Sequence, residues 1–302
     1  MSAESSTADP PVNAPVQRDA SMEAFEFVRE LAQQLSNSSI ELPSFPDVAM
    51  RVHKVLSDEN VSTERIVRVL GAEPMIATRV LSMANSAALN PGNKPVTELR
   101  AAVTRLGLDA LRSAVISFAM AQLRRAQTFK GIERHLSVLW QHSVQVASLS
   151  FVIARRSSKA NPETTMLTGL LHGVGKLYIL THSMRHPALF ADQTTYQRII
   201  RDWHANIAKA LLESWHVADE IVDAVHSYED ESRDLRGGAG ALADVLELAD
   251  QLSLCKDSPD LMRERLKARR ASVRLGIDLE TGKRLVGESA EELVALREAL
   301  GT

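Results

Sequence analysis

The sequence predicts an all-α fold, and the prediction rests on three features of its composition. Aromatic residues form only 4% of the 302 residues, and only 14 residues are glycine, whereas β-sandwiches and barrels depend on aromatic strands and glycine-rich turns. Alanine, leucine, arginine and glutamate, which favour helices, are abundant. Hydrophobic residues form 45% and charged residues 24% of the chain, so extensive disorder is excluded and a sizeable core is expected.

The first helix is expected at about 21–36, after an N-terminal segment, residues 1–20, that we expect to be a disordered tail. This tail carries prolines among small polar residues, and it cannot bury enough apolar surface to offset the entropy cost of ordering it. Short helices are expected next, because apolar residues recur at helical spacing between turn signals. They are expected at about 48–56, 66–70, 74–84, 96–106 and 111–119.

A polar stretch over 124–133 separates these helices from a second helical region. The segment 166–181 is apolar on most sides, so we expect it to be a buried helix. From Pro259 onward the chain is expected to be helical and highly charged, and a loop is expected over 236–240. Amphipathic helices are also predicted in the second region at about 139–156, 195–214, 218–228 and 240–255.

Charge and targeting features narrow the function classes. The 35 Lys and Arg residues nearly balance the 38 Asp and Glu residues, so the chain has no general attraction to nucleic acid. The N-terminus lacks the apolar region of a secretory signal. No run of about 18 apolar residues predicts a membrane-spanning helix, and the single cysteine, Cys255, cannot form an intrachain disulfide. We therefore expect a cytoplasmic protein without membrane contact.

A basic run over 263–274 contains six basic residues and one acidic residue. Such a run could bind nucleic acid or an acidic partner, or it could be a solvated helix face. The acidic residues Glu288, Glu291 and Glu292 downstream could neutralise it. The run contains no aromatic residue, which argues against nucleic acid as its partner.

Four polar residues stand in apolar surroundings. His142 shares a helix face with apolar residues, His172 lies in an apolar stretch, and His226 follows Val222 by four positions. Asp250 lies on a leucine stripe, and a buried carboxylate needs a cation, a histidine donor or a metal as its partner. Each histidine could be a satisfied core residue. Three of them on separate helices, together with the aspartate, could instead form one polar cluster.

Two sets of motifs in the chain resemble known families. His142, the string 169–176 (Gly-Leu-Leu-His-Gly-Val-Gly-Lys) and Asp250 in Leu-Ala-Asp resemble the HD phosphohydrolase superfamily. The first half of the chain resembles HDOD (HD-related output domain) modules. That resemblance rests on Leu42-Pro43-x-Phe45-Pro46 and on the strings at 73–81, 84–87 and 105–108.

The resemblance runs from about residue 38 to residue 255, and it implies a two-lobed helical bundle. A small N-terminal helical lobe, about 38–125, would pack on an HD-like helical lobe that begins at about 132. On this basis we expect an HDOD module over 38–236. The segment 237–302 would supply the last HD-like helix, to about 255, and a charged helical C-terminal extension.

The resemblance also implies a function, namely a regulatory output module in bacterial signal transduction that contacts other signalling proteins. Members of the family are generally not established enzymes. The metal positions that carry over are His142, His172 and Asp250, and His204 and His226 match accessory histidines. The superfamily's His-Asp doublet is here His172-Gly173.

Glycine at 173 decides the chemistry that we expect. Two-metal phosphoester hydrolysis needs anionic oxygen ligands, and glycine supplies neither a ligand nor a charge. We therefore expect no catalytic residue, no cofactor and no bound metal. The five metal and accessory positions would be vestigial, although one weakly held divalent ion at His142, His172 and Asp250 stays open. The alternative is a metal-dependent HD-type phosphohydrolase that acts on a nucleotide or a cyclic dinucleotide.

Two further interpretations concern the same site. Gly173 and Gly169 would lie on one helix face and let a neighbouring helix approach closely, and Gly173 with Lys176 could line a cleft for a small regulatory ligand. Lys176 could steady a phosphate or lie near Asp250. We expect Asp250 to pair with His142 or His226. The sequence does not set the oligomeric state.

Overall fold

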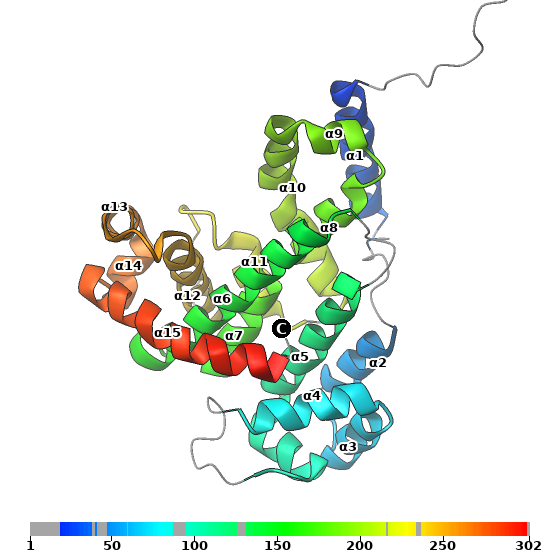
Figure 1. Cartoon of the computed structure of the whole chain (residues 1–302), viewed down its shortest axis with the longest axis vertical. Coiled ribbons are helices and arrows are strands. Elements are labelled where there is room, and N and C mark those ends of the chain that lie inside the picture. Colours follow the sequence, from blue (N-terminus) through cyan, green and yellow to red (C-terminus); the bar gives the residue numbers. More distant parts are fainter. Residues whose placement is uncertain are drawn as a thin grey trace, which may run out of the picture.

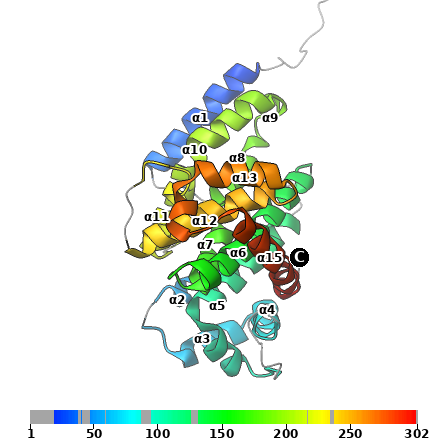
Figure 2. The same ribbon diagram turned by 90° about the vertical axis from the view of Figure 1, so that its left-hand side faces the viewer.

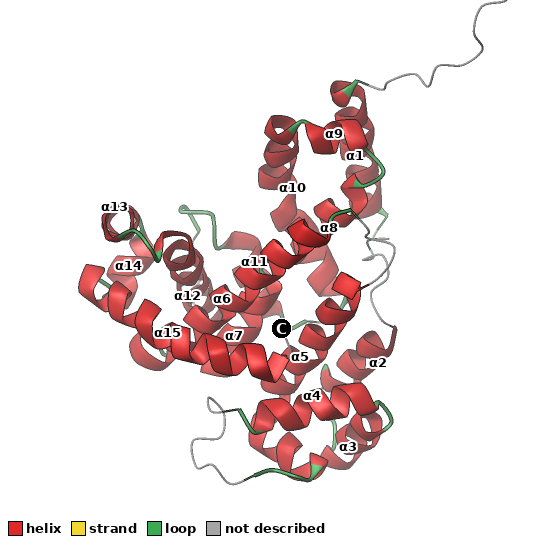
Figure 3. Ribbon diagram, viewed as in Figure 1, coloured by secondary structure: helices red, strands yellow, loops and turns green. Residues whose placement is uncertain are grey.

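The computed structural model describes residues 19–37, 40, 47–58, 60–86, 95–125, 131–215, 217–233 and 237–300. Over these residues the regular structure is entirely helical and contains no β-strand (Figure 3). This confirms the all-α prediction. The predicted disordered tail lies outside the described residues as far as residue 18, and the part of the predicted polar stretch at 126–130 lies outside them as well.

The first lobe is a set of helices at one end of the molecule (Figure 1). Pro74 begins the third of these helices, where its missing N–H is not needed for a helix hydrogen bond. The fourth bends sharply at Gly107, whose φ of 71° favours glycine. The predicted helices at 96–106 and 111–119 are the two halves of this bent helix. The lobe comprises α2 (Asp47–Leu56), α3 (Thr63–Gly71), α4 (Pro74–Ala84) and α5 (Leu99–Arg125).

The second lobe is built around one long helix, α6 (Glu133–Ser157), which packs against α5, α7, α8, α12 and α15. Among the described helices, α6 is the one long and apolar enough to cross a membrane, but 67% of its most apolar window is buried by its neighbours. It is the central core helix of this fold. The other members are α7 (Pro162–Leu171), α8 (Val174–Ser183), α9 (Pro187–Ala191), α10 (Gln193–Ser214), α11 (Asp219–Ser227) and α12 (Gly237–Cys255).

Two predicted elements of this lobe are wrong in detail. The apolar stretch 166–181 is buried, but it forms two helices that are separated at His172 and Gly173. The break redirects the chain so that α8 packs on α10, where Gly175 lies against the backbone of His204. The loop expected over 236–240 is helical from Gly237 onward. The glycines cost helix stability, but Gly238 lets α12 approach the Glu220 side chain of α11 closely.

The C-terminal extension is helical, as predicted, and it joins the two lobes. Its last helix packs on α6 and also contacts α4 and α5 of the first lobe. Ser148 on α6 donates a hydrogen bond of 2.8 Å to the carbonyl of Ser289 in this helix. The extension comprises α13 (Pro259–Ala268), α14 (Arg270–Leu275) and α15 (Leu279–Leu300).

The first helix, α1 (Ala20–Ser36), matches the helix predicted at 21–36, but it belongs to the second lobe. It packs on α9 and α10, at the end of the molecule opposite α2–α4 (Figures 1 and 2). The carboxylate of Glu23 accepts hydrogen bonds from the backbone N–H groups of Ala188 and Leu189, at 2.8 and 3.1 Å. A carboxylate at this place satisfies free donors at the start of α9.

Candidate functional site

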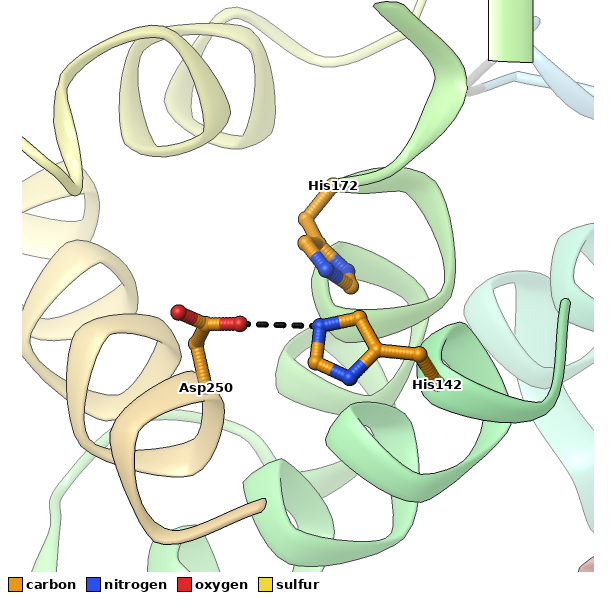
Figure 4. A group of neighbouring side chains, drawn as sticks. All are labelled: His142, His172 and Asp250. Atoms are coloured by element: carbon orange, nitrogen blue, oxygen red, sulfur yellow. Dashed lines mark hydrogen bonds and ion pairs between the residues drawn. The ribbon is translucent and has the colours of Figure 1, made fainter. Parts of the chain in front are cut away.

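Two histidines and an aspartate from three helices meet in the second lobe. His142 lies on α6, His172 follows the last turn of α7, and Asp250 lies on α12. One possible ligand atom from each residue lies within 4.8 Å of the other two (Figure 4). The helix packing explains the meeting, because α6 contacts both α7 and α12. We call these three residues the histidine–aspartate cluster.

His142 and Asp250 form the polar contact of this cluster. Nε2 of His142 lies 3.0 Å from Oδ1 of Asp250, and the Asp250 side chain is only 8% exposed. Burial alone would raise the pKa of the Asp250 carboxyl. The hydrogen bond from His142 and the charges of nearby histidines and Lys176 outweigh burial and hold that pKa below its usual value. Asp250 is therefore ionised at neutral pH, and His142 is the partner that the sequence required.

His172 is completely buried and has one unused nitrogen. Its Nδ1 lies 2.6 Å from the carbonyl oxygen of Gly169, so Nδ1 carries the proton and donates. Among the described residues, its Nε2 has no hydrogen-bond partner. Burial, with a smaller effect of His142, lowers the pKa of His172 to about 3. The ring is therefore neutral at neutral pH, and its free lone pair is one of the three ligand atoms of the cluster.

A second polar group lies beside the cluster and centres on Glu229, directly after α11. His204 on α10 has its Nε2 3.0 Å from Oε2 of Glu229. Lys176 on α8 lies 3.4 Å from Oε1, and Tyr228 donates a 2.7 Å hydrogen bond to the same oxygen. Burial would raise the pKa of Glu229, but these partners, His204 foremost, hold it well below its usual value. Tyr228 links the two groups, because its ring packs edge-on against His172.

The structure thus sorts the five predicted positions into three places. His142, His172 and Asp250 lie together, and His204 lies one contact further out, behind Glu229. His226 is elsewhere, with its Nε2 3.0 Å from Oδ1 of Asn206. Of the two partners expected for Asp250, His142 is correct and His226 is wrong.

A pocket of about 390 Å³ opens beside the cluster, and we call it the histidine pocket. Lys176 is among the residues that line it. Gly173 is absent from its lining, because a side chain there would point at α6, with a Cβ 2.8 Å from Oγ of Ser143. The lining residues are His142, Lys176, Tyr228, Glu229, Glu247, Asp250, Gln251, Leu254 and Arg269.

Sequence reasoning missed several residues of this pocket. Tyr228 and Glu229 directly follow α11, and a carboxylate next to an apolar helix is the one signal that could have revealed them. Glu247 precedes Asp250 by three positions, so it lies on the same helix face. Arg269 comes from the extension, and no sequence spacing ties it to the cluster.

An ion-pair network holds the extension to α12 near this pocket. The Arg233 side chain is 5% exposed and lies 2.9 Å from Asp244 and 2.5 Å from Glu247. From the basic run, Arg269 lies 2.5 Å from Glu231, and Arg274 pairs with Asp244. The expected role of Glu288 is therefore wrong, since it pairs with Arg156 on α6. Glu291 and Glu292 have side chains outside the described residues.

The residues present fit one divalent ion and not two. Two imidazoles and a carboxylate suit a borderline ion such as Zn²⁺, and the orphaned Nε2 of His172 is an available donor. Such an ion would lower the pKa of a bound water. A second ion would need further anionic ligands, and glycine at 173, next to Ser143 and Leu139 of α6, supplies none.

Comparisons with known proteins agree with this fold. The HDOD domain family model matches residues 42–231. A Shewanella amazonensis protein, provisionally described as a metal-dependent phosphohydrolase, is 24% identical, with 89% of this chain and 99% of that chain covered and a TM-score of 0.64. An HDOD domain protein of unknown function from Geobacter sulfurreducens is 24% identical, with coverages of 93% and 98% and a TM-score of 0.60.

A third structure belongs to a protein from Marinobacter aquaeolei that is provisionally described as a signal transduction protein. It is 20% identical, with 95% of this chain and 67% of that chain covered and a TM-score of 0.62. At these identities the similarities show a shared fold. Among curated proteins, none matches the chain.

Proposed function

The chain belongs to the HDOD family, and from this premise we propose that it is a non-catalytic regulatory module of signal transduction that acts through contacts with other proteins. The observation that carries the proposal is Gly173. It stands where the HD superfamily has the aspartate of its His-Asp doublet. Its backbone lies so close to α6 that a Cβ would meet Oγ of Ser143 at 2.8 Å. The position serves helix packing.

The electrostatics of the cluster support the same proposal. Two divalent ions carry four positive charges, whereas the cluster offers one carboxylate and two imidazoles. Loss of an outer partner alone usually costs a metal site about 10- to 100-fold in affinity or activity. A missing carboxylate ligand should cost more. A small ligand in the histidine pocket could bias the module, because Lys176 and Asp250 there offer both signs of charge.

The test is a hydrolysis assay on protein purified without chelator. Bis(p-nitrophenyl) phosphate and a cyclic dinucleotide serve as substrates, with and without added Mn²⁺. We expect turnover equal to that of His172→Ala, in which the cluster is broken. His226→Ala is the matched control, because it removes a histidine outside the cluster. Turnover that EDTA abolishes, and that only His172→Ala and not His226→Ala removes, would establish the alternative metal-dependent phosphohydrolase.

A second candidate function, binding of a single divalent ion, is favoured by the unpartnered Nε2 of His172. An ion would have to replace the contact between His142 and Asp250, so we expect weak binding. Titration calorimetry with Zn²⁺ and Mn²⁺ should give one site per chain, which is lost in His172→Ala and kept in His226→Ala. Equal binding by both variants would contradict this assignment.

A further inference from the structure

The C-terminal extension forms a groove of its own, beyond the residues that the HDOD family model matches. The groove lies between α13, α14 and the start of α15, at the edge of the molecule that faces left in Figure 1. Its volume is about 650 Å³. We call it the extension groove, and its lining residues are Arg263, Leu266, Lys267, Ser272, Val273, Gly276, Ile277, Asp278 and Leu279.

The groove has an apolar base and an exposed apolar rim. Leu266 and Ile277 are buried below it and belong to the core. Val273 stands on α14 with 81% of its surface exposed, the highest value among the exposed large apolar residues of the described chain. A groove with an apolar base and an exposed valine at its rim gives an apolar side chain of a partner a place to be buried.

The charges beside the groove are not all satisfied within the chain. Arg269 and Arg274 are bound to carboxylates of Glu231 and Asp244. Among the described residues, Lys267 forms no ion pair, and Arg263 pairs only with Asp260, whose side chain is 92% exposed. The α13 rim therefore keeps positive charge available for a partner.

The opposite wall carries the carboxylate of Asp278, which already accepts a hydrogen bond within the chain. Oδ1 of Asp278 accepts a 2.8 Å hydrogen bond from the backbone N–H of Thr281 and so caps α15. The groove thus combines an apolar base with a positive rim on α13. Its complement is a segment with apolar side chains next to carboxylates.

We propose that the extension groove docks a segment of a partner protein, with an apolar side chain against Val273 and Asp or Glu residues against Lys267 and Arg263. The proposal rests on the proposed function, and it supplies the surface for the protein contacts. A protein fits better than a nucleic acid, because the lining contains no aromatic residue on which bases could stack.

The groove and the histidine pocket share a wall, the turn between α13 and α14 at Arg269. The Arg269 side chain lines the histidine pocket, whereas Leu266, Lys267 and Ser272 on either side of it line the groove. Oγ of Ser272 donates to the carbonyls of Leu266 and Arg269 and closes this turn. A segment in the groove therefore lies against the residues on either side of Arg269.

The test selects binders from a library of short random peptides displayed on phage, with the full chain immobilised. We expect the enriched peptides to combine apolar residues with Asp or Glu. Their affinity, measured by fluorescence anisotropy, should fall about tenfold or more in Val273→Asp, because burial of one valine side chain is lost. Val138→Asp is the matched control, since Val138 on α6 is 60% exposed and lies outside the groove.

Charge reversal gives an independent test of the docking proposal. Lys267→Glu should weaken the same peptides, and added salt should weaken their binding to the wild type. Lys159→Glu, which changes an exposed lysine outside the groove, should not weaken peptide binding. The proposal is overturned if no peptide is enriched, if the binders lack acidic residues, or if Val273→Asp binds them as well as Val138→Asp does.

One further outcome is also decisive. A DNA or RNA oligonucleotide that binds the wild type and is lost in Lys267→Glu would assign the surface to nucleic acid and overturn the proposal. Val273→Asp leaves every residue of the histidine pocket unchanged. Failure of the docking proposal is therefore distinguishable from failure of the proposed function, because the hydrolysis assay tests the latter.

Discussion

Nε2 of His142 lies 3.0 Å from Oδ1 of Asp250, and this one contact joins α6 to α12 across 108 positions of sequence. Both side chains are largely withdrawn from water, with exposures of 23% and 8%. The contact therefore does two things. It satisfies a buried carboxylate, and it occupies two of the three atoms that could hold a metal ion.

The first prediction concerns this contact. His142→Ala leaves Oδ1 of the buried Asp250 carboxylate without its donor, so we expect a loss of about 2 kcal/mol in the free energy of unfolding. Asp250→Asn removes the charge that needs a donor. The double variant should lose less than the sum of the two single changes, by about 1 kcal/mol. Urea unfolding at neutral pH measures all four proteins, and strictly additive losses would contradict the prediction.

The second prediction concerns Arg233, which lies buried between Asp244 and Glu247. Arg233→Met removes the most buried positive charge of this network and leaves only more exposed arginines beside the two carboxylates, so we expect a loss of about 3 kcal/mol in stability. Arg263→Met is the matched control, because Arg263 pairs with an exposed Asp260 on the surface of α13. It should change stability by less than about 1 kcal/mol. Similar losses in both variants would show that burial does not determine how much an arginine's ion pairs contribute to stability.

Local sequence patterns predicted the helices well, because helical periodicity and turn residues act over a few neighbours. The requirement for a partner at Asp250 was also readable, because a buried carboxylate is costly wherever it lies. The sequence did not show that the partner of Asp250 is His142 and not His226. The choice depends on how α6, α11 and α12 pack, and no spacing within one helix carries that information.

The errors in the site have the same origin. The one predicted helix over 166–181 is broken at Gly173, where the approach of α8 to α10 overrides the apolar pattern. Arg269 enters the histidine pocket from the extension through ion pairs with Glu231 and Glu247. These are contacts between segments far apart in sequence, and they exist only once the fold is formed.

The third prediction compares two helical glycines. A Cβ at Gly175 of α8 would collide with the carbonyl oxygen of His204, whereas at Gly287 of α15 no atom of another described segment lies within 4 Å of the corresponding position. Gly175→Ala should therefore destabilise the protein by about 2 to 3 kcal/mol. Gly287→Ala should stabilise it by about 0.5 to 1 kcal/mol, because alanine favours the helix. Thermal unfolding measures both, and shifts of the same sign would contradict the packing at Gly175.

The fourth prediction concerns Gly173 and Ser143. Gly173→Asp places a Cβ 2.8 Å from Oγ of Ser143, so we expect a loss of about 1 to 3 kcal/mol in stability. Ser143→Ala removes the obstructing oxygen. The double variant Gly173→Asp/Ser143→Ala should recover part of the loss, and it should bind Mn²⁺ more tightly than the wild type because a carboxylate is added next to His172.

Gly173→Ala is the control for this pair, because it adds the Cβ without the carboxylate. It should lose stability without gaining Mn²⁺ affinity in calorimetry. If Gly173→Asp were as stable as the wild type, position 173 would not be a packing contact. If the double variant gained no affinity, it would not be a former metal position.

The fifth prediction concerns the pH dependence of stability through Glu229. Its pKa in the folded protein is depressed, since hydrogen bonds from His204 and Tyr228 and the charge of Lys176 outweigh the opposing effect of burial. An ionised Glu229 therefore stabilises the fold at pH values above about 4.3, the value for an unfolded chain. This contribution is lost as the pH falls from there toward the folded-state pKa.

Glu229→Gln cannot ionise, so its deficit in unfolding free energy should be largest at neutral pH and should shrink at about pH 3. Urea unfolding across this range measures the deficit, with the exposed Glu264→Gln as control, and a deficit that stays constant with pH would show that the ionised carboxylate is not what stabilises the site.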